Sequence, residues 1–159
     1  MAHEWPADFE DLRVGVGCPM CERSESDVSP FGARFFEGVW SDAFVGRHPV
    51  RPGYAFVVWK GRHVAEPPEL GPEEAAGFWS EVARPARAVE LRSEPTKMNW
   101  LHMGNGVPHL HVHLVPRPRD DRKAGGPVAA EDFERDRVVP LADDALRVEA
   151  AALRGLVVD

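Results

Sequence analysis

Three histidines alternate with apolar residues in the stretch HLHVHLVPR, residues 109–117. Successive side chains of a β-strand point to opposite faces, so a strand here places His109, His111 and His113 together on one face. An imidazole offers a nucleophilic nitrogen, acid and base chemistry near neutral pH, and metal ligation, none of which a plain solvent-exposed face requires. The spacing therefore predicts a strand that carries a shared chemical site. The alternatives are a solvated strand face and a metal-binding histidine cluster.

A glycine-rich turn, Gly104-Asn105-Gly106-Val107-Pro108, comes directly before the first histidine. The turn and the alternation together resemble the signature of the histidine-triad (HIT) superfamily of nucleotide hydrolases and transferases. The resemblance covers roughly residues 18–117. It implies a HIT-like α+β fold with a mainly antiparallel sheet of about five strands, a long helix and a C-terminal helix.

The composition limits the classes of function. The chain has 159 residues, enough for one domain with a hydrophobic core, and a formal net charge of −7. General nucleic-acid binders need an excess of Lys and Arg, so we expect no nucleic-acid partner. No run of apolar residues is long enough to cross a membrane, and the N-terminus lacks the order of a signal peptide, so we expect a cytoplasmic protein without a membrane partner.

The pattern outside the histidine stretch favours one α+β domain over residues 1–159, with short strands around one long helix. The helix is predicted to begin near Pro72, which is followed by two acidic residues, and Pro85 is expected to kink or interrupt it near Arg84. A second helix is predicted from Asp143 to Gly155. Runs of aromatic and β-branched residues predict strands over residues 33–38, 39–45, 54–59 and 97–103.

The two cysteines are spaced Cys18-Pro19-Met20-Cys21. In a reducing compartment such a pair is typical of a redox dithiol or of half a zinc site. The residues on both sides indicate loop and turn rather than the strand and helix that flank a thioredoxin-like pair, so zinc is favoured. Two further ligands are then needed to complete a tetrahedron, and histidines are the candidates.

The resemblance implies which histidines these are. In zinc-containing members the first triad histidine joins two cysteines and one further histidine that belongs to a Pro-Lys-x-His element. Here His63 follows Lys60-Gly61-Arg62 after an apolar strand. The implied ligands are Cys18, Cys21, His63 and His109, in a closed structural site that would support the N-terminal segment 1–30.

The resemblance also implies the catalytic residues. The middle histidine of the triad is the nucleophile that attacks phosphorus, which places this role on His111, and the third, His113, contacts the phosphate. We expect four further residues to bind substrate: Asn105 and Gly106 in the turn, Asn99 near an amide position of the family, and Arg117 beside the triad strand.

Two departures from the family pattern stand out. Asn105 and Gly106 replace a Gln-Ser or Gln-Thr pair, and residues 44–49 lack the Asp that holds the ribose, with Asp42 as the nearest acid. The resemblance still implies a homodimeric nucleotide hydrolase or transferase. It would act at the α-phosphate of a nucleotide conjugate, a phosphoramidate or a dinucleoside polyphosphate, through a nucleotidyl-His111 intermediate.

Other hypotheses remain open at this point. They are a non-catalytic, zinc-stabilised nucleotide-binding or adaptor protein, a phosphorylase or sugar-phosphate nucleotidylyltransferase, and a redox protein. Residues 118–159 form a variable C-terminal tail with a helix, which the resemblance does not explain.

Overall fold

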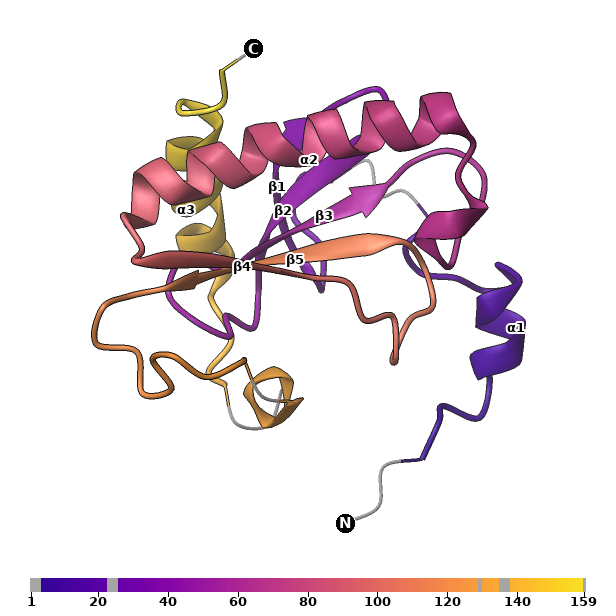
Figure 1. Cartoon of the computed structure of the whole chain (residues 1–159), viewed down its shortest axis with the longest axis horizontal. Helices are drawn as coiled ribbons and strands as arrows, with labels where there is room; N and C mark the ends of the chain where they lie inside the picture. Colours follow the sequence, from indigo (N-terminus) through magenta and orange to yellow (C-terminus); the bar gives the residue numbers. More distant parts are fainter. Residues whose placement is uncertain (1–3, 23–25, 129, 135–137, 159) are drawn as a thin grey trace.

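The computed structural model describes residues 4–22, 26–128, 130–134 and 138–158. Five strands form one antiparallel sheet in the order β1-β2-β3-β5-β4 (Figure 1). This confirms the predicted α+β architecture. The strands are β1 (Gly32–Glu37), β2 (Ser41–Gly46), β3 (Ala55–Trp59), β4 (Lys97–Leu101) and β5 (His111–Arg117).

Two helices cover one face of this sheet. The long helix α2 (Pro72–Ser93) lies across it, and α3 (Asp143–Arg154) packs against β1 and β2 (Figure 1). Both helices contribute apolar side chains to one core with the strands. Phe78 and Leu146, for example, are fully buried there beside Val57 and Leu114. A short helix, α1 (Phe9–Arg13), precedes the cysteines.

The expectation that Pro85 interrupts the long helix is wrong, because α2 continues through it as one helix of 22 residues. A proline inside a helix removes one backbone hydrogen bond. Tertiary contacts hold this helix on both sides of that position. Glu81, one turn earlier, accepts hydrogen bonds from the backbone N–H groups of Val39 and Trp40 and from the Ser41 hydroxyl, at 2.7, 3.0 and 2.8 Å. Val89, one turn later, is fully buried.

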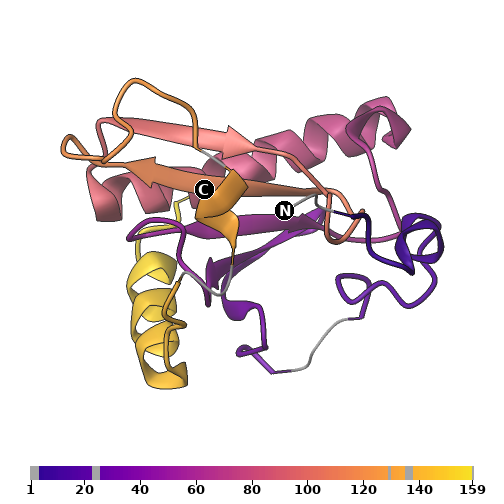
Figure 2. The same ribbon diagram turned by 90° about the horizontal axis from the view of Figure 1, so that it is seen from below.

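The opposite face of the sheet carries a second, smaller apolar cluster around Tyr54, Phe56 and Val115. Segments from both ends of the chain cover it. Met20 and Phe31 pack on it from the N-terminal part, and Phe133 from the short helix η2 (Ala130–Phe133), which lies on the side of the sheet away from α2 (Figures 1 and 2). Among the described residues, no helix combines the length and apolar character that crossing a membrane requires.

Arg117 ties the loop that follows β5 to the sheet. Its five N–H donors have five acceptors: both carboxylate oxygens of Asp121, the Asn99 side chain, and the backbone carbonyls of Lys123 and Gly126. Arg51 binds the same Asp121 carboxylate at 2.8 Å. These hydrogen bonds from Arg117 and Arg51 hold the pKa of Asp121 well below its usual range.

We expect Asp121→Asn to lower the free energy of unfolding at pH 7 by about 3 kcal/mol, because it removes the carboxylate that two largely buried guanidinium groups share. Among the described residues, Arg117 then has no carboxylate partner, and Arg51 keeps only its longer contact with Asp132 at 3.4 Å. Because the pKa of Asp121 is lowered in the fold, its contribution is present above the unfolded value of about 4 and is lost as the pH falls through the folded value. Urea unfolding at several pH values measures this. The difference between parent and variant should shrink in acid, while the exposed neighbour variant Asp120→Asn should match the parent throughout.

Candidate functional site

A cavity of about 330 Å³ lies around His111 and His113 on the face of the sheet away from α2. Strand β5 provides both histidines, and the turn between β4 and β5 provides Asn105 and Gly106. Gly104 begins this turn with a φ of 69°, a left-handed conformation that favours glycine. The structure thus brings together four of the predicted site residues.

The hydrogen bonds define which nitrogen of His111 carries the proton. Its Nδ1 lies 2.6 Å from the backbone carbonyl of His109, which can only accept, so Nδ1 carries the proton and Nε2 carries the lone pair. His113 Nε2 lies 3.1 Å from His111 Nε2 and therefore donates to it. His113 Nδ1 is then an acceptor, and the Tyr54 hydroxyl donates to it at 2.7 Å.

The same residues are buried enough to stay neutral. Burial lowers the pKa of His111 to about 4 and that of His113 to about 3, so neither imidazole is charged at pH 7. A neutral imidazole with a lone pair on Nε2 is the form that can act as a nucleophile. The site therefore holds His111 in a reactive tautomer.

Tyr54 is a site residue that the sequence analysis missed. It is the single tyrosine of the chain, and its ring stacks on that of His113 with 6.0 Å between centroids. A Cβ atom at Gly46 would lie 2.2 Å from the Tyr54 ring, so residue 46 cannot carry a side chain without displacing it. Tyr54 thus fills the space beside Gly46, the last residue of β2. Gly46 lies within residues 44–49, where the family pattern would have the ribose-binding Asp. In the strand predicted over residues 54–59, alternate side chains share a face. This alternation puts Tyr54 on the same face as Phe56, and it was the sequence signal that could have identified Tyr54 as a site residue.

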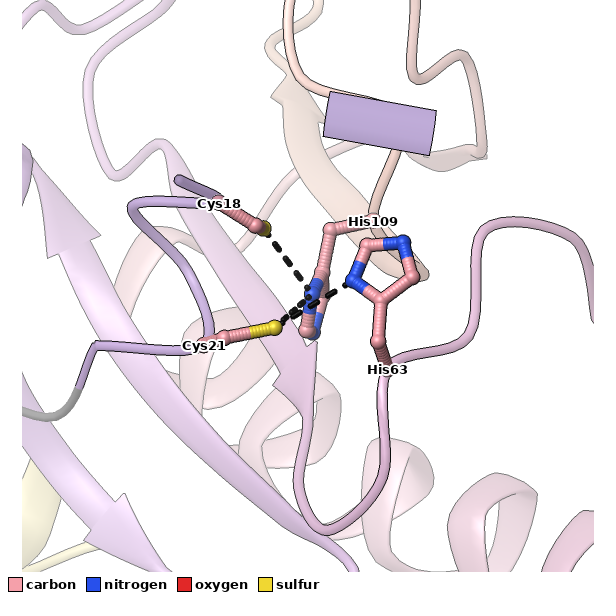
Figure 3. Close-up of side chains that lie close together, drawn as sticks. All are labelled: Cys18, Cys21, His63 and His109. Atoms are coloured by element: carbon pink, nitrogen blue, oxygen red, sulfur yellow. Dashed lines mark hydrogen bonds between the residues drawn. The ribbon is translucent and has the colours of Figure 1, made fainter. Parts of the chain in front are cut away.

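His109 lies apart from the other two histidines. It precedes β5 by two residues, and its ring faces Cys18, Cys21 and His63 (Figure 3). The expectation of one shared histidine face is therefore wrong for His109. Its side chain belongs to the cysteine cluster, while its backbone carbonyl orients His111. The three histidines therefore belong to two neighbouring sites, the cysteine cluster and the cavity around His111, and His109 contacts both.

The cysteine cluster has the geometry of a tetrahedral metal site. One ligand atom from each of Cys18, Cys21, His63 and His109 lies within 4.8 Å of all the others. The distance from Cys18 Sγ to His109 Nδ1 is 3.5 Å, and Cys21 Sγ lies 3.2 Å from His63 Nδ1 and 3.5 Å from His109 Nδ1 (Figure 3). Zinc bond lengths and tetrahedral angles put sulfur and nitrogen ligands about 3.5 Å apart.

The protonation pattern of the two histidine ligands also fits a metal. His109 Nε2 donates to the Trp59 carbonyl and His63 Nε2 to the Arg13 carbonyl, both at 3.1 Å. Both Nδ1 lone pairs therefore face the thiols, as ligands held by outer hydrogen bonds do. Burial and the Cys18 thiol raise the pKa of Cys21 to about 11, and a bound cation would favour the thiolate instead. These residues fit a zinc ion.

Asn99 and Arg117 lie elsewhere. They contact each other at 2.7 Å, on the side of the sheet edge where the loop after β5 folds back, and neither lines the cavity around His111. The guanidinium donors of Arg117 all have acceptors within the chain. The role of these two residues in substrate binding stays a prediction, and their contacts favour a structural role.

A family model and similar proteins of known name agree on the family to which this chain is similar. A model described as the HIT domain matches residues 34–120. The bis(5′-nucleosyl)-tetraphosphatase (asymmetrical) of Schizosaccharomyces pombe is 30% identical over 98 residues, which are 58% of this chain and 53% of that protein. The chain thus spans about half the length of this relative. The bis(5′-adenosyl)-triphosphatase of Dictyostelium discoideum is 28% identical over 77% of this chain and 83% of its own.

Solved structures show the same fold. A histidine triad protein from Bradyrhizobium japonicum superposes with a TM-score of 0.69 over 86% of this chain and 98% of its own, at 21% identity. A zinc-bound histidine triad family protein from Mycobacterium smegmatis superposes with a TM-score of 0.55 over 77% of this chain and 84% of its own, at 25% identity. The described elements therefore form a HIT-like fold.

Proposed function

The chain belongs to the HIT family, and on that premise we propose that it hydrolyses or transfers the nucleotidyl group of a nucleotide conjugate through a covalent bond to His111. The observation that carries the proposal is the state of His111. Its Nδ1 proton is held by the His109 carbonyl, and its Nε2 faces a cavity beside a second histidine. Similarity to two dinucleoside polyphosphate hydrolases supports a dinucleoside polyphosphate as the conjugate, and a phosphoramidate would react at the same atom.

In the first step the Nε2 lone pair of His111 attacks the α-phosphorus. A phosphorus–nitrogen bond forms, and the bond from phosphorus to the leaving amine or polyphosphate oxygen breaks, with its electron pair going to the leaving group. The Nε2–H of His113 donates a hydrogen bond to a phosphate oxygen, and the leaving group takes up any proton it needs from solvent. Asn105 and Gly106, with the backbone of their turn, are placed at the cavity wall to bind phosphate oxygens.

In the second step water attacks the same phosphorus. An oxygen–phosphorus bond forms, the phosphorus–nitrogen bond breaks with its electrons returning to Nε2, and the attacking water releases one proton to solvent. A nucleoside monophosphate then leaves. Two contacts support both steps. The His109 carbonyl stabilises the positive charge that forms on the His111 ring, and Tyr54 holds His113 with its Nε2 proton directed at the reacting atoms. Dividing one displacement into two easier ones is the advantage of a covalent intermediate.

We propose that zinc binds Cys18, Cys21, His63 and His109 and has a structural role. Four protein ligands complete a tetrahedron and leave no position for water, so the ion would supply stability rather than Lewis-acid chemistry. The zinc-bound relative supports the choice of metal.

A homodimer is part of the same proposal. Strand β4 lies at the edge of the sheet, and Trp100 on it is 44% exposed. An exposed edge with a large apolar side chain is a surface that a second copy can cover.

Trapping of the intermediate tests the proposed mechanism. The protein is mixed rapidly with adenosine or guanosine 5′-phosphoramidate, and intact-protein mass spectrometry should show one added nucleotidyl group, which peptide mapping places on His111. His102→Gln, which alters a histidine outside the cavity lining, should still form the adduct. Turnover without an adduct on His111 would contradict the mechanism. Nucleotide binding with neither adduct nor turnover would support the non-catalytic hypothesis.

A further inference from the structure

A second cavity of about 300 Å³ adjoins the cavity around His111. The two share Met20, Phe31 and Phe56 in their walls, so they lie side by side on the same face of the sheet. Phe44 and Phe56 lie along the second cavity with their rings stacked, 5.3 Å between centroids and 16° between planes. Flat apolar walls of this kind suit a planar aromatic ring such as a nucleobase.

The strand register aligns this second cavity with the histidines. Asp42 of β2 pairs with Val58 of β3, and Val58 pairs with His111 of β5. Asp42 is therefore two strands from His111, about 10 Å across the sheet. Phe44, Phe56 and His113 form the adjacent row. A nucleotide with its α-phosphate at His111 and His113 can extend across β3, which places its base near Phe44 and Phe56 and the edge of the base toward Asp42.

Asp42 is an unusual residue in such a wall. It is 7% exposed, and its Oδ1 has no hydrogen-bond partner among the described residues. Lys60 Nζ forms an ion pair with that oxygen at 3.1 Å and donates a hydrogen bond to the Gly38 carbonyl at 2.9 Å. Burial raises the pKa of Asp42, and Lys60 acts in the opposite direction and favours the charged form. Lys60 balances the charge of this carboxylate, and the carboxylate keeps acceptor lone pairs that donors of a ligand can fill.

Among the nucleobases, only guanine presents the pair of parallel hydrogen-bond donors that matches the two oxygens of a carboxylate. A charged carboxylate can only accept hydrogen bonds. Guanine presents two parallel donors, N1–H and an N2–H, which match its two oxygens. Adenine and cytosine each place a ring nitrogen acceptor beside the amine, and uracil flanks its N–H with two carbonyls, so each sets a lone pair against the carboxylate.

We propose that Asp42 binds the edge of the base and makes guanine nucleotides the preferred conjugates of this protein. The inference rests on the proposed function, because it takes the phosphate to lie at His111. A site that hydrogen-bonds one base discriminates strongly against a base that leaves its buried groups unpaired.

The test compares kcat/KM for guanosine and adenosine 5′-phosphoramidate. We expect the parent to prefer the guanosine compound at least about tenfold, and Asp42→Asn to reduce that ratio at least about tenfold, because an asparagine side chain can pair with adenine. Glu37→Gln is the matched control. Glu37 also lies near Lys60, at 3.6 Å, but is largely exposed and outside the cavity wall, so its variant should keep the parent ratio.

Calorimetry with GMP and AMP on the parent separates this inference from the proposed function. Tighter binding of GMP without His111-dependent turnover would preserve the role of Asp42 and contradict the catalytic proposal. Equal or adenine-favouring kcat/KM values in a protein that turns over, or an unchanged ratio in folded Asp42→Asn, would overturn the inference. If Asp42→Asn does not fold, two measurements on the parent still test the guanine preference. They are the ratio of kcat/KM for the guanosine and adenosine compounds and the ratio of the affinities for GMP and AMP.

Discussion

Replacing His111 with alanine is expected to lower kcat for release of nucleoside monophosphate from a nucleoside phosphoramidate by at least about 1000-fold, since loss of a covalent nucleophile removes the whole two-step route. The other triad histidine of the cavity, His113, does not present a lone pair toward that point. His113 Nδ1 accepts a hydrogen bond from the Tyr54 hydroxyl, so the ring proton of His113 is on Nε2, which donates to His111. Steady-state product release measured by chromatography gives the rate.

The histidine variant His102→Gln is the control for this measurement. His102 Nδ1 contacts the His111 carbonyl at 3.0 Å, so the substitution removes an imidazole close to β5 without removing a cavity residue. We expect it to keep most of the activity. A His111→Ala protein that remains folded and works within tenfold of the parent rate would remove His111 from the mechanism.

Loss of zinc is expected to lower the free energy of unfolding by about 4 kcal/mol, the value for a ligand present at a thousand times its dissociation constant. The cluster joins Cys18 and Cys21 to residues 42 to 91 positions away, so its loss frees the N-terminal segment from the sheet. Elemental analysis should give one zinc per chain for the parent and none for Cys18→Ser with Cys21→Ser. Thermal or urea unfolding, with and without chelator, gives the change in stability.

Activity should fall with the metal as well, because the zinc ligand His109 also provides the carbonyl that orients His111. His102→Gln serves as the control, since His102 lies outside both the cluster and the cavity lining, and it should retain the zinc and the parent response to chelator. A Cys18–Cys21 disulfide without stoichiometric metal would instead support the redox hypothesis.

Much of the fold and of the metal site could be predicted from local patterns. The alternation at residues 109–117 and the apolar run at 54–59 predicted strands, and the structure has them at His111–Arg117 and Ala55–Trp59. Such a pattern is readable because a period of two is a property of each strand alone. The Cys-x-x-Cys pair and the resemblance gave four metal-ligand positions that the structure brings within 4.8 Å. The prediction that Pro85 would interrupt the long helix was wrong, because the propensity rule describes an isolated helix. In this protein the hydrogen bonds of Glu81 and the buried face of α2 hold the helix in place.

The residue types at 109–113 and their spacing were enough to indicate imidazole chemistry on an antiparallel sheet, because side-chain direction along a strand needs no knowledge of its neighbours. What stands opposite those imidazoles depends on strand register and on the packing of distant segments. The pairing of β2, β3 and β5 placed Asp42 and Phe44 in line with the histidines, and the absence of a side chain at Gly46 admitted Tyr54. These relationships join residues of different strands, with Asp42 lying 69 positions before His111, and a pattern within one strand carries no information about them.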